Sequence, residues 1–223
     1  MRLVLLGPPG VGKGTQAELL NQRFGACHLS TGELFRAARC AADHSPAMRE
    51  ALAAMQRGEL VADELVVRMV RERSQCLRCC GGFLLDGVPR TVAQVEALDE
   101  LFEELGVSLD AVLSYELDLE AIVRRLSGRR TCSDCSAVFH LASRPPRDES
   151  VCDHCGGRLL QRDDDHPDAV RVRMGAYRQA TQPLQDFYRR RNLLISISAQ
   201  GRPDEIAQRT FRSLENRLGV LTD

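Results

Sequence analysis

The sequence lacks an excess of charge of either sign. Its 30 lysines and arginines and 31 aspartates and glutamates leave a formal net charge of −1, so no overall field draws the protein to nucleic acid or to an anionic membrane. It also lacks an apolar run of membrane-spanning length. The opening residues, MRLVLLGPPG, are apolar over too short a stretch for a secretion signal and indicate a buried strand. We therefore expect a cytoplasmic protein with no nucleic acid and no membrane among its partners.

The cysteines are odd in number, nine in all. In a chain without a secretion signal, this argues against a disulfide framework. Two C-x-x-C pairs separated by sixteen residues are typical of a structural zinc site, and they are formed by Cys132, Cys135, Cys152 and Cys155. Soft thiolates in a tetrahedral set favour zinc over magnesium or calcium. The set leaves no place for a catalytic water, so its predicted role is structural.

Alternatives to this zinc site remain open. His140 and His154 are alternative ligands, and a reduced metal-free loop, an iron site or a nucleic-acid-binding zinc ribbon are alternative interpretations. A further C-x-x-C, formed by Cys76 and Cys79, has no partner pair and lies just before a buried strand. Buried or idle thiols are the interpretation we favour there.

Short apolar runs alternate with helical patterns along the chain. Strands are predicted at residues 3–6, 27–29, 83–85, 111–115 and 193–197. Helices are predicted between them, among them one at 15–24 and one that Asp63 caps. Such alternation predicts an α/β fold with a five-stranded parallel sheet flanked by helices. The polar segment from Gly128 to Asp165 breaks the alternation, and we expect it to be an inserted subdomain held by a metal.

A glycine-rich run, GPPGVGKGT, follows the first strand and opens a helix. Gly7, Gly12 and Lys13 match the phosphate-loop pattern G-x-x-x-x-G-K-S/T. Glycines let backbone N–H groups surround phosphate oxygens, and the following helix directs its positive end at the anion. The residue after the lysine is Gly14, and the hydroxyl comes one place later, at Thr15. The run predicts the phosphate-binding loop of a phosphotransferase.

Five motifs occur in the order seen in adenylate kinases, and the chain resembles that family over essentially its whole length. They are GPPGVGKGTQ (7–16), STGELFR (30–36), GFLLDGVPRT (82–91), GRR (128–130) and QRDDD (161–165). The chain looks like the long-lid bacterial form with a zinc-binding lid. Val88 stands where the family usually has Phe.

The resemblance implies a P-loop NTPase fold in three parts. These are a core of residues 1–29, 62–127 and 166–223, a helical NMP-binding domain of residues 30–61, and a zinc-binding lid of residues 128–165. The implied reaction is reversible phosphoryl transfer from Mg²⁺-bound ATP to AMP, giving two ADP. Mg²⁺ and structural Zn²⁺ are the implied cofactors, and the family suggests a monomer.

The resemblance also assigns site residues. Those implied to bind ATP are Gly10, Val11, Gly12, Lys13, Gly14, Thr15, Arg129, Val138, Phe139 and Arg202. Those implied to bind AMP are Thr31, Arg36, Glu59, Leu60, Val61, Gly87, Val88, Pro89, Arg90, Gln94, Arg162 and Arg173. Thr31 and Gln94 match positions that read adenine. Thr15 and Asp86 match positions that orient Mg²⁺-bound water.

The implied catalytic residues are all cationic: Lys13, Arg90, Arg125, Arg129, Arg162 and Arg173. Arg36 and Arg90 are implied to hold the AMP phosphate, while Arg125 and Arg129 approach the ATP phosphates from the lid side. Phosphoryl transfer between two nucleotides requires charge neutralisation and exclusion of water. Arginine binds phosphate through a bidentate fork. The AMP phosphate is already a nucleophile, so catalysis by positioning and electrostatics needs no general base.

Two alternative functions remain open at this point. One is a related kinase that prefers UMP or CMP, against which the long lid and the Thr31/Gln94 pair favour AMP. The other is a non-catalytic module that binds nucleotide and carries a zinc ribbon. The full set of arginines argues against the second alternative.

Overall fold

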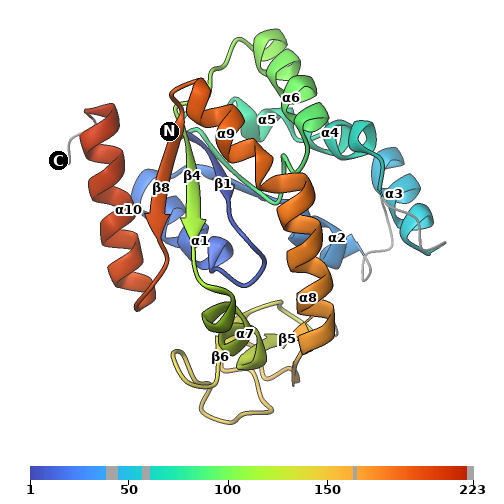
Figure 1. Cartoon of the computed structure of the whole chain (residues 1–223). Coiled ribbons are helices and arrows are strands. Elements are labelled where there is room, and N and C mark those ends of the chain that lie inside the picture. Colours follow the sequence, from blue (N-terminus) through green and yellow to red (C-terminus); the bar gives the residue numbers. More distant parts are fainter. Residues whose placement is uncertain (39–44, 57–60, 163–164, 220–223) are drawn as a thin grey trace.

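The computed structural model describes residues 1–38, 45–56, 61–162 and 165–219, with the backbone alone at 33, 36–38, 54–56, 167 and 168. Its centre is a parallel sheet (Figure 1). The strand order is β2 (Cys27–Ser30), β3 (Phe83–Asp86), β1 (Arg2–Leu6), β4 (Ala111–Glu116) and β8 (Leu194–Ser198). The predicted α/β fold with five parallel strands is confirmed. All five strands end at one edge of the sheet, where the glycine-rich loop follows β1.

Side chains alternate between the two faces of the sheet along each strand, and helices cover both faces, so both are buried. Val4 and Leu6 of β1 pack into one hydrophobic cluster, whereas Leu3 and Leu5 pack into another. The first cluster is covered by α4 (Asp63–Arg71), α5 (Ser74–Leu77), α6 (Val92–Leu105) and α9 (Pro183–Arg190). The second is covered by α1 (Lys13–Phe24) and α10 (Pro203–Leu218).

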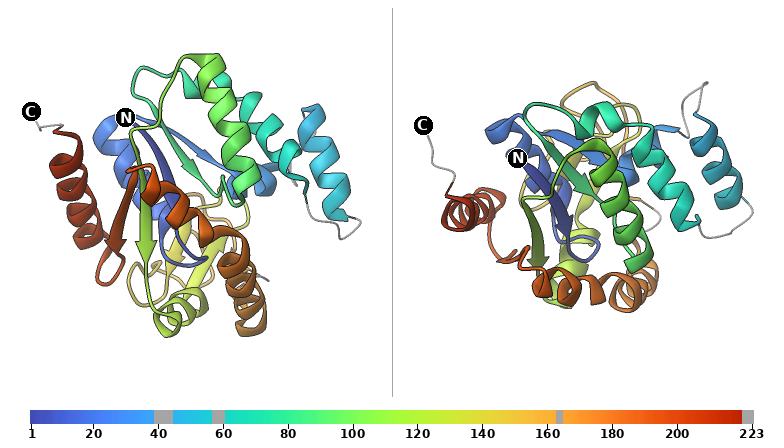
Figure 2. Two further views of the ribbon diagram at one scale, coloured as in Figure 1. Left: turned by 45° about the horizontal axis from the view of Figure 1, so that its top comes forward. Right: turned by 90° about the horizontal axis from the view of Figure 1, so that it is seen from above.

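The remaining helices lie around this core. They are α2 (Thr31–Ala38), α3 (Pro46–Gln56), α7 (Leu119–Ser127), α8 (Pro167–Ala176) and a π-helical turn (Tyr177–Thr181) that leads into α9. Helix α3 lies at the side of the molecule opposite α10 (Figure 2). No helix in the described part of the chain combines the length and the apolar character needed to span a membrane.

A second, antiparallel sheet lies within the predicted lid segment, residues 128–165. Its order is β6 (Val138–His140), β5 (Arg129–Cys132) and β7 (Leu159–Leu160). Its own small core is formed by Cys132, Phe139, Cys152 and Leu159. It lies next to α7, in the lower part of the view in Figure 1.

The predicted cap of α4 is wrong. Ala62 is the N-cap residue, with extended backbone angles and no side-chain cap bond. Asp63 is the first helical residue, and its carboxylate instead accepts hydrogen bonds from the side chains of Thr91 and Gln94 at the start of α6. A tertiary contact therefore takes the acceptor that a helix cap would have used.

Candidate active site

The loop between β1 and α1 depends on glycine at defined positions. Gly10 has φ +81°, and a Cβ there would lie 2.6 Å from Leu126 Cγ, so a side chain would clash as well as strain the backbone. Gly12, with φ 105°, is the N-cap of α1. The helix consequently begins at Lys13, two residues earlier than the sequence pattern predicted. The first N–H groups of a helix lack partners within the helix and are available to an anion.

Lys13 lies across this loop. Its Nζ donates to the carbonyl oxygens of Gly7 (2.8 Å) and Pro8 (3.2 Å). Burial lowers the pKa of Lys13 to about 8, although the nearby carboxylate of Asp86 raises it. The positive charges of Arg90, Arg173 and Arg129 lower it further. The charges of three arginines from separate elements thus act on Lys13, an arrangement that suits a polyphosphate.

Asp86 ends β3 and faces the start of α1. Gly14 directly precedes Thr15, and a Cβ at Gly14 would lie 3.9 Å from Asp86 Oδ2. Burial raises the pKa of this carboxyl, but the His28 imidazole and the charges of Lys13 and Arg90 outweigh that effect and leave it below its ordinary value. Asp86 is therefore an anion beside the phosphate loop, and an ionised carboxylate is a ligand that fits hydrated Mg²⁺.

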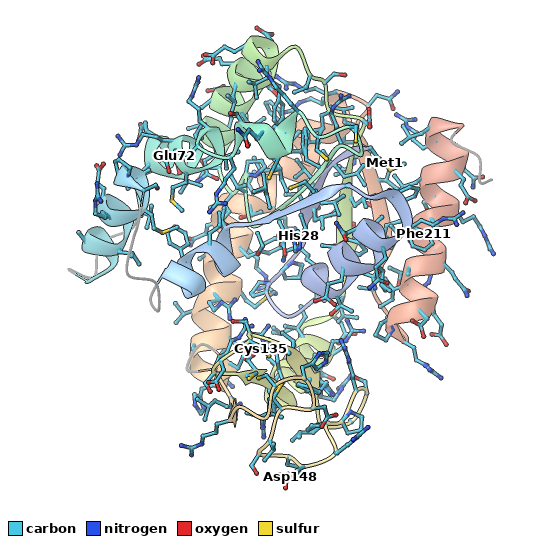
Figure 3. The ribbon with its side chains drawn as sticks, turned by 180° about the vertical axis from the view of Figure 1, so that it is seen from behind. Met1, His28, Glu72, Cys135, Asp148 and Phe211 are labelled. Atoms are coloured by element: carbon cyan, nitrogen blue, oxygen red, sulfur yellow. The ribbon has the colours of Figure 1, made fainter. Side chains whose placement is uncertain are left out.

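His28 is the neighbour of Asp86 that sequence reasoning missed. It lies on β2, near the middle of the molecule in Figure 3. Its Nε2 is 3.8 Å from Asp86 Oδ2. The parallel register pairs His28 with Leu84 and Ser30 with Asp86. The contact between the imidazole and the carboxylate depends on the pairing of two strands, so no local motif could have indicated it.

A second group of predicted residues meets at the carboxyl end of β3. A Cβ at Gly87 would lie 2.6 Å from Thr31 Oγ1 and 3.4 Å from Arg90 Nη2, so the hydroxyl and the guanidinium flank this glycine. Arg90 Nε donates to the Gly87 carbonyl oxygen (2.8 Å), and Arg90 N donates to Gln94 Oε1 (2.7 Å). Val88 is 1% exposed and packs in the core.

Arg125 lies on α7 and joins two loops. Its Nη1 donates to the Val11 carbonyl (2.8 Å), and its Nη2 donates to the carbonyls of Ala199 (2.7 Å) and Gly201 (3.2 Å). Arg125 thus ties the phosphate loop to the β8–α10 loop, which ends at Arg202, the N-cap of α10. Arg209 of α10 also donates to carbonyl oxygens of this second loop. Sequence reasoning missed Arg209, because an exposed helical arginine carries no local signal.

The other arginines gather where the lid segment joins the core. Asp165 is 1% exposed, and its carboxylate accepts from both Nε (2.7 Å) and Nη2 of Arg129 on β5. Arg173 Nη1 on α8 is 3.8 Å from the same carboxylate. Arg162 Nε donates to Thr131 Oγ1 (2.9 Å). Three guanidinium groups are thereby held between the small sheet and α8.

The four predicted zinc ligands meet in the small sheet. Their sulfurs lie within 4.8 Å of one another, with Sγ–Sγ distances of 3.4 Å for Cys132–Cys155 and 3.6 Å for Cys135–Cys152. Tetrahedral zinc with bonds of about 2.3 Å would separate its sulfur ligands by about 3.8 Å. The four thiols fit that geometry. Figure 3 labels Cys135 in this part of the molecule.

Comparison with known proteins decides the family. The adenylate kinase family model matches residues 5–193. The chain belongs to the adenylate kinase family. An adenylate kinase of Caldicellulosiruptor bescii is 48% identical over 220 residues, covering 99% of this chain and 100% of the relative. One from Carboxydothermus hydrogenoformans is 45% identical over 218 residues (98% and 99%). One from Bacillus licheniformis is 48% identical over 206 residues (92% and 94%).

Some residues that the adenylate kinase pattern implies are not part of the site described above. Glu59 and Leu60 lie outside the described residues, and only the backbone of Arg36 is described, in α2. Val61 packs beside the α3–α4 cluster. The ring of Phe139 is buried in the lid core, at 4% exposure. An ATP contact at Val138 and Phe139 stays a prediction.

The C-x-x-C formed by Cys76 and Cys79 has a different environment. Burial and the neighbouring Cys76 thiol raise the pKa of Cys27 to about 12, which keeps Cys27 neutral. Cys76 and Cys79 are half-buried. Among the described residues, the only cluster with metal-ligand geometry is that of the lid.

Proposed function

We propose that this adenylate kinase family member transfers a phosphoryl group reversibly from ATP to AMP, giving two ADP. The observation that carries the proposal is the set of cations around the phosphate loop: Lys13 Nζ lies on the loop carbonyls, and the charges of Arg90, Arg129 and Arg173 act on it. A site that binds two nucleotides has more phosphate charge to neutralise than a site that binds one. Two polyanionic substrates that meet require several cations, because their mutual repulsion must be neutralised.

Each group has a proposed task. The loop N–H groups and Lys13 hold the β- and γ-phosphates of ATP, and Arg36 and Arg90 hold the AMP phosphate. Arg129, Arg162 and Arg173 surround the phosphoryl group in transit and exclude water. Asp86 and Thr15 would hold hydrated Mg²⁺, which when bound would neutralise part of the phosphate charge. The rate enhancement comes from positioning and electrostatics, with no proton transfer to a side chain.

We also propose how the chain divides. Residues 1–29, 62–127 and 166–223 form the core, residues 30–61 bind the monophosphate, and residues 128–165 form a lid. Zinc held by Cys132, Cys135, Cys152 and Cys155 has a structural role in the lid, because four thiolates leave it no open position. A monomer in the cytoplasm completes the proposal.

A panel of nucleoside monophosphates tests the proposal. Each is mixed with MgATP and the purified protein, and nucleoside diphosphate formation is followed in a coupled assay. AMP is expected to give the highest kcat/KM, and Lys13→Ala is expected to lower turnover by at least about 1,000-fold because a phosphate-stabilising charge is lost. A preference for UMP or CMP would overturn the choice of AMP.

A further inference from the structure

Asp63 lies beside the proposed base-reading residue. Its Oδ1 accepts from Gln94 Nε2 at 2.7 Å, and its Oδ2 accepts from Thr91 Oγ1 at 2.7 Å. Thr91 Oγ1 in turn accepts from Gln94 N at 3.2 Å as the N-cap of α6. Gln94 is 4% exposed, so its carboxamide depends on protein partners for its hydrogen bonds.

These contacts determine which way the Gln94 carboxamide faces. The carboxylate of Asp63 is only an acceptor, so it requires the amide nitrogen. The backbone N–H of Arg90 is only a donor, and it lies 2.7 Å from Gln94 Oε1, so it requires the amide oxygen. Rotating the amide by 180° would place oxygen against the carboxylate and NH₂ against N–H. Both ends of the carboxamide are therefore fixed.

A fixed carboxamide distinguishes purine bases. It retains one N–H and one oxygen lone pair, which together match a base edge with an acceptor beside a donor. Adenine offers a ring nitrogen acceptor beside the N6 amino donor. Hypoxanthine reverses this order, with the O6 acceptor beside the N1–H donor. A carboxamide that turned freely would match either base, and a fixed one matches only one of them.

We propose that Asp63 is a positioning residue that sets the base selectivity of the acceptor site by fixing the orientation of the Gln94 carboxamide. The inference rests on the proposed function, in which Gln94 reads the base of AMP. Asp63 acts through Gln94 and does not touch the substrate. Thr91 supports it by orienting the carboxylate.

The test compares Asp63→Asn and Asp63→Ala with wild type, using AMP and inosine monophosphate as acceptors. Asparagine keeps the size of the side chain but can present either oxygen or NH₂ to Gln94. The ratio of kcat/KM for AMP to that for inosine monophosphate is expected to fall by about tenfold in both variants, because a charge-assisted hydrogen bond is lost. KM for AMP is expected to rise, while KM for ATP stays within about twofold. Asp63→Asn decides the case if the alanine variant does not fold.

Two further variants separate positioning from general structure. Glu104→Gln weakens another link between α4 and α6, the exposed Arg71–Glu104 pair, and is expected to leave the ratio unchanged. In a Gln94→Ala background, Asp63→Ala is expected to change the ratio by less than about twofold, because its effect passes through Gln94.

Three results would decide against the inference. The first is an AMP to inosine monophosphate ratio of kcat/KM that is unchanged in both Asp63 variants. The second is a fall of that ratio in Glu104→Gln as large as in the Asp63 variants. The third is a fall caused by Asp63→Ala in the Gln94→Ala background as large as in the wild-type background. Failure of the proposed function would look different, since the wild-type protein itself would not phosphorylate AMP.

Discussion

Lys13 carries a positive charge in a buried environment that disfavours it. Its ammonium is held among backbone carbonyls and facing arginines, where burial and like charges disfavour the charged form. Asp86 supplies the opposing negative charge. A bound polyphosphate would add further negative charge and stabilise protonated Lys13. Protonation of this residue and ATP binding are therefore coupled.

This coupling predicts a pH dependence. Because the pKa of Lys13 in the free protein is about 8, kcat/KM for ATP is expected to fall as the pH rises through about 8, approaching tenfold per pH unit. Lys13→Arg, which stays charged, is expected to lose this descending limb whatever its absolute rate. Initial rates at limiting ATP between pH 6.5 and 9.5 measure both. A wild-type profile that stays flat to pH 9.5 would contradict the assignment.

The same pKa shift has an opposite consequence for stability. The folded pKa lies below the ordinary value of 10.5, so between about pH 8 and 10.5 the unfolded chain binds more protons than the folded one. The contribution of Lys13 to the free energy of unfolding therefore rises with pH across that window. Lys13 favours substrate binding at neutral pH at the expense of fold stability.

At the scale of elements, the small sheet is the part that depends most on a metal. Its strands are short, with two to four residues each, and its apolar core contains only four buried side chains, two of them cysteines. A core of this size does not stabilise a fold without a further constraint. Four thiolates around one zinc supply that constraint.

Removal of the metal is expected to melt the lid first. Chelation under reducing conditions should lower the melting temperature by more than about 5 °C, because a few kcal/mol of stability are lost. Hydrogen exchange should speed up in residues 129–160 while β1 and β4 stay protected. Elemental analysis should give one zinc per chain, and a Cys76→Ser, Cys79→Ser double variant is the matched control that should retain it. An unaltered melt after complete metal removal would contradict a structural role.

At the scale of the whole molecule, Asp165 connects the small sheet to α8. Its buried carboxylate lies between Arg129 of the lid sheet and Arg173 of α8. These are also two of the cations proposed to hold the phosphoryl group. The carboxylate therefore occupies, in the free protein, some of the hydrogen-bonding capacity that phosphate would take.

Asp165→Asn tests this connection. Removing the charge leaves two guanidinium groups side by side, and we expect about 2 kcal/mol less stability in urea unfolding at low salt. Since an anion can replace the missing charge, ATP should raise the stability of the variant more than that of wild type. Equal stabilisation of both proteins by ATP would show that Asp165 does not balance the phosphate-binding arginines.

The sequence predicted those features that adjacent residues encode. The glycine run, the apolar strands and the paired cysteines each have a local physical cause, namely backbone freedom, burial on both faces and thiolate spacing. Boundaries shifted by one or two residues where an end depended on a neighbour, as at Gly12, whose left-handed conformation starts α1 early. The family resemblance identified the sequence positions of the phosphate-binding arginines but not the residues that they contact.

Tertiary structure alone decided how these parts act on one another. Asp63 has the sequence context of a helix cap, yet it holds Gln94, because α4 packs against α6. His28 meets Asp86 through strand register, and Asp165 pairs with Arg129 across the lid junction. Electrostatic and hydrogen-bonding partners depend on distances of a few ångströms between residues far apart in the chain, which no local pattern contains. The sequence by itself determined the kind of chemistry, and the fold determined which side chains fix its geometry.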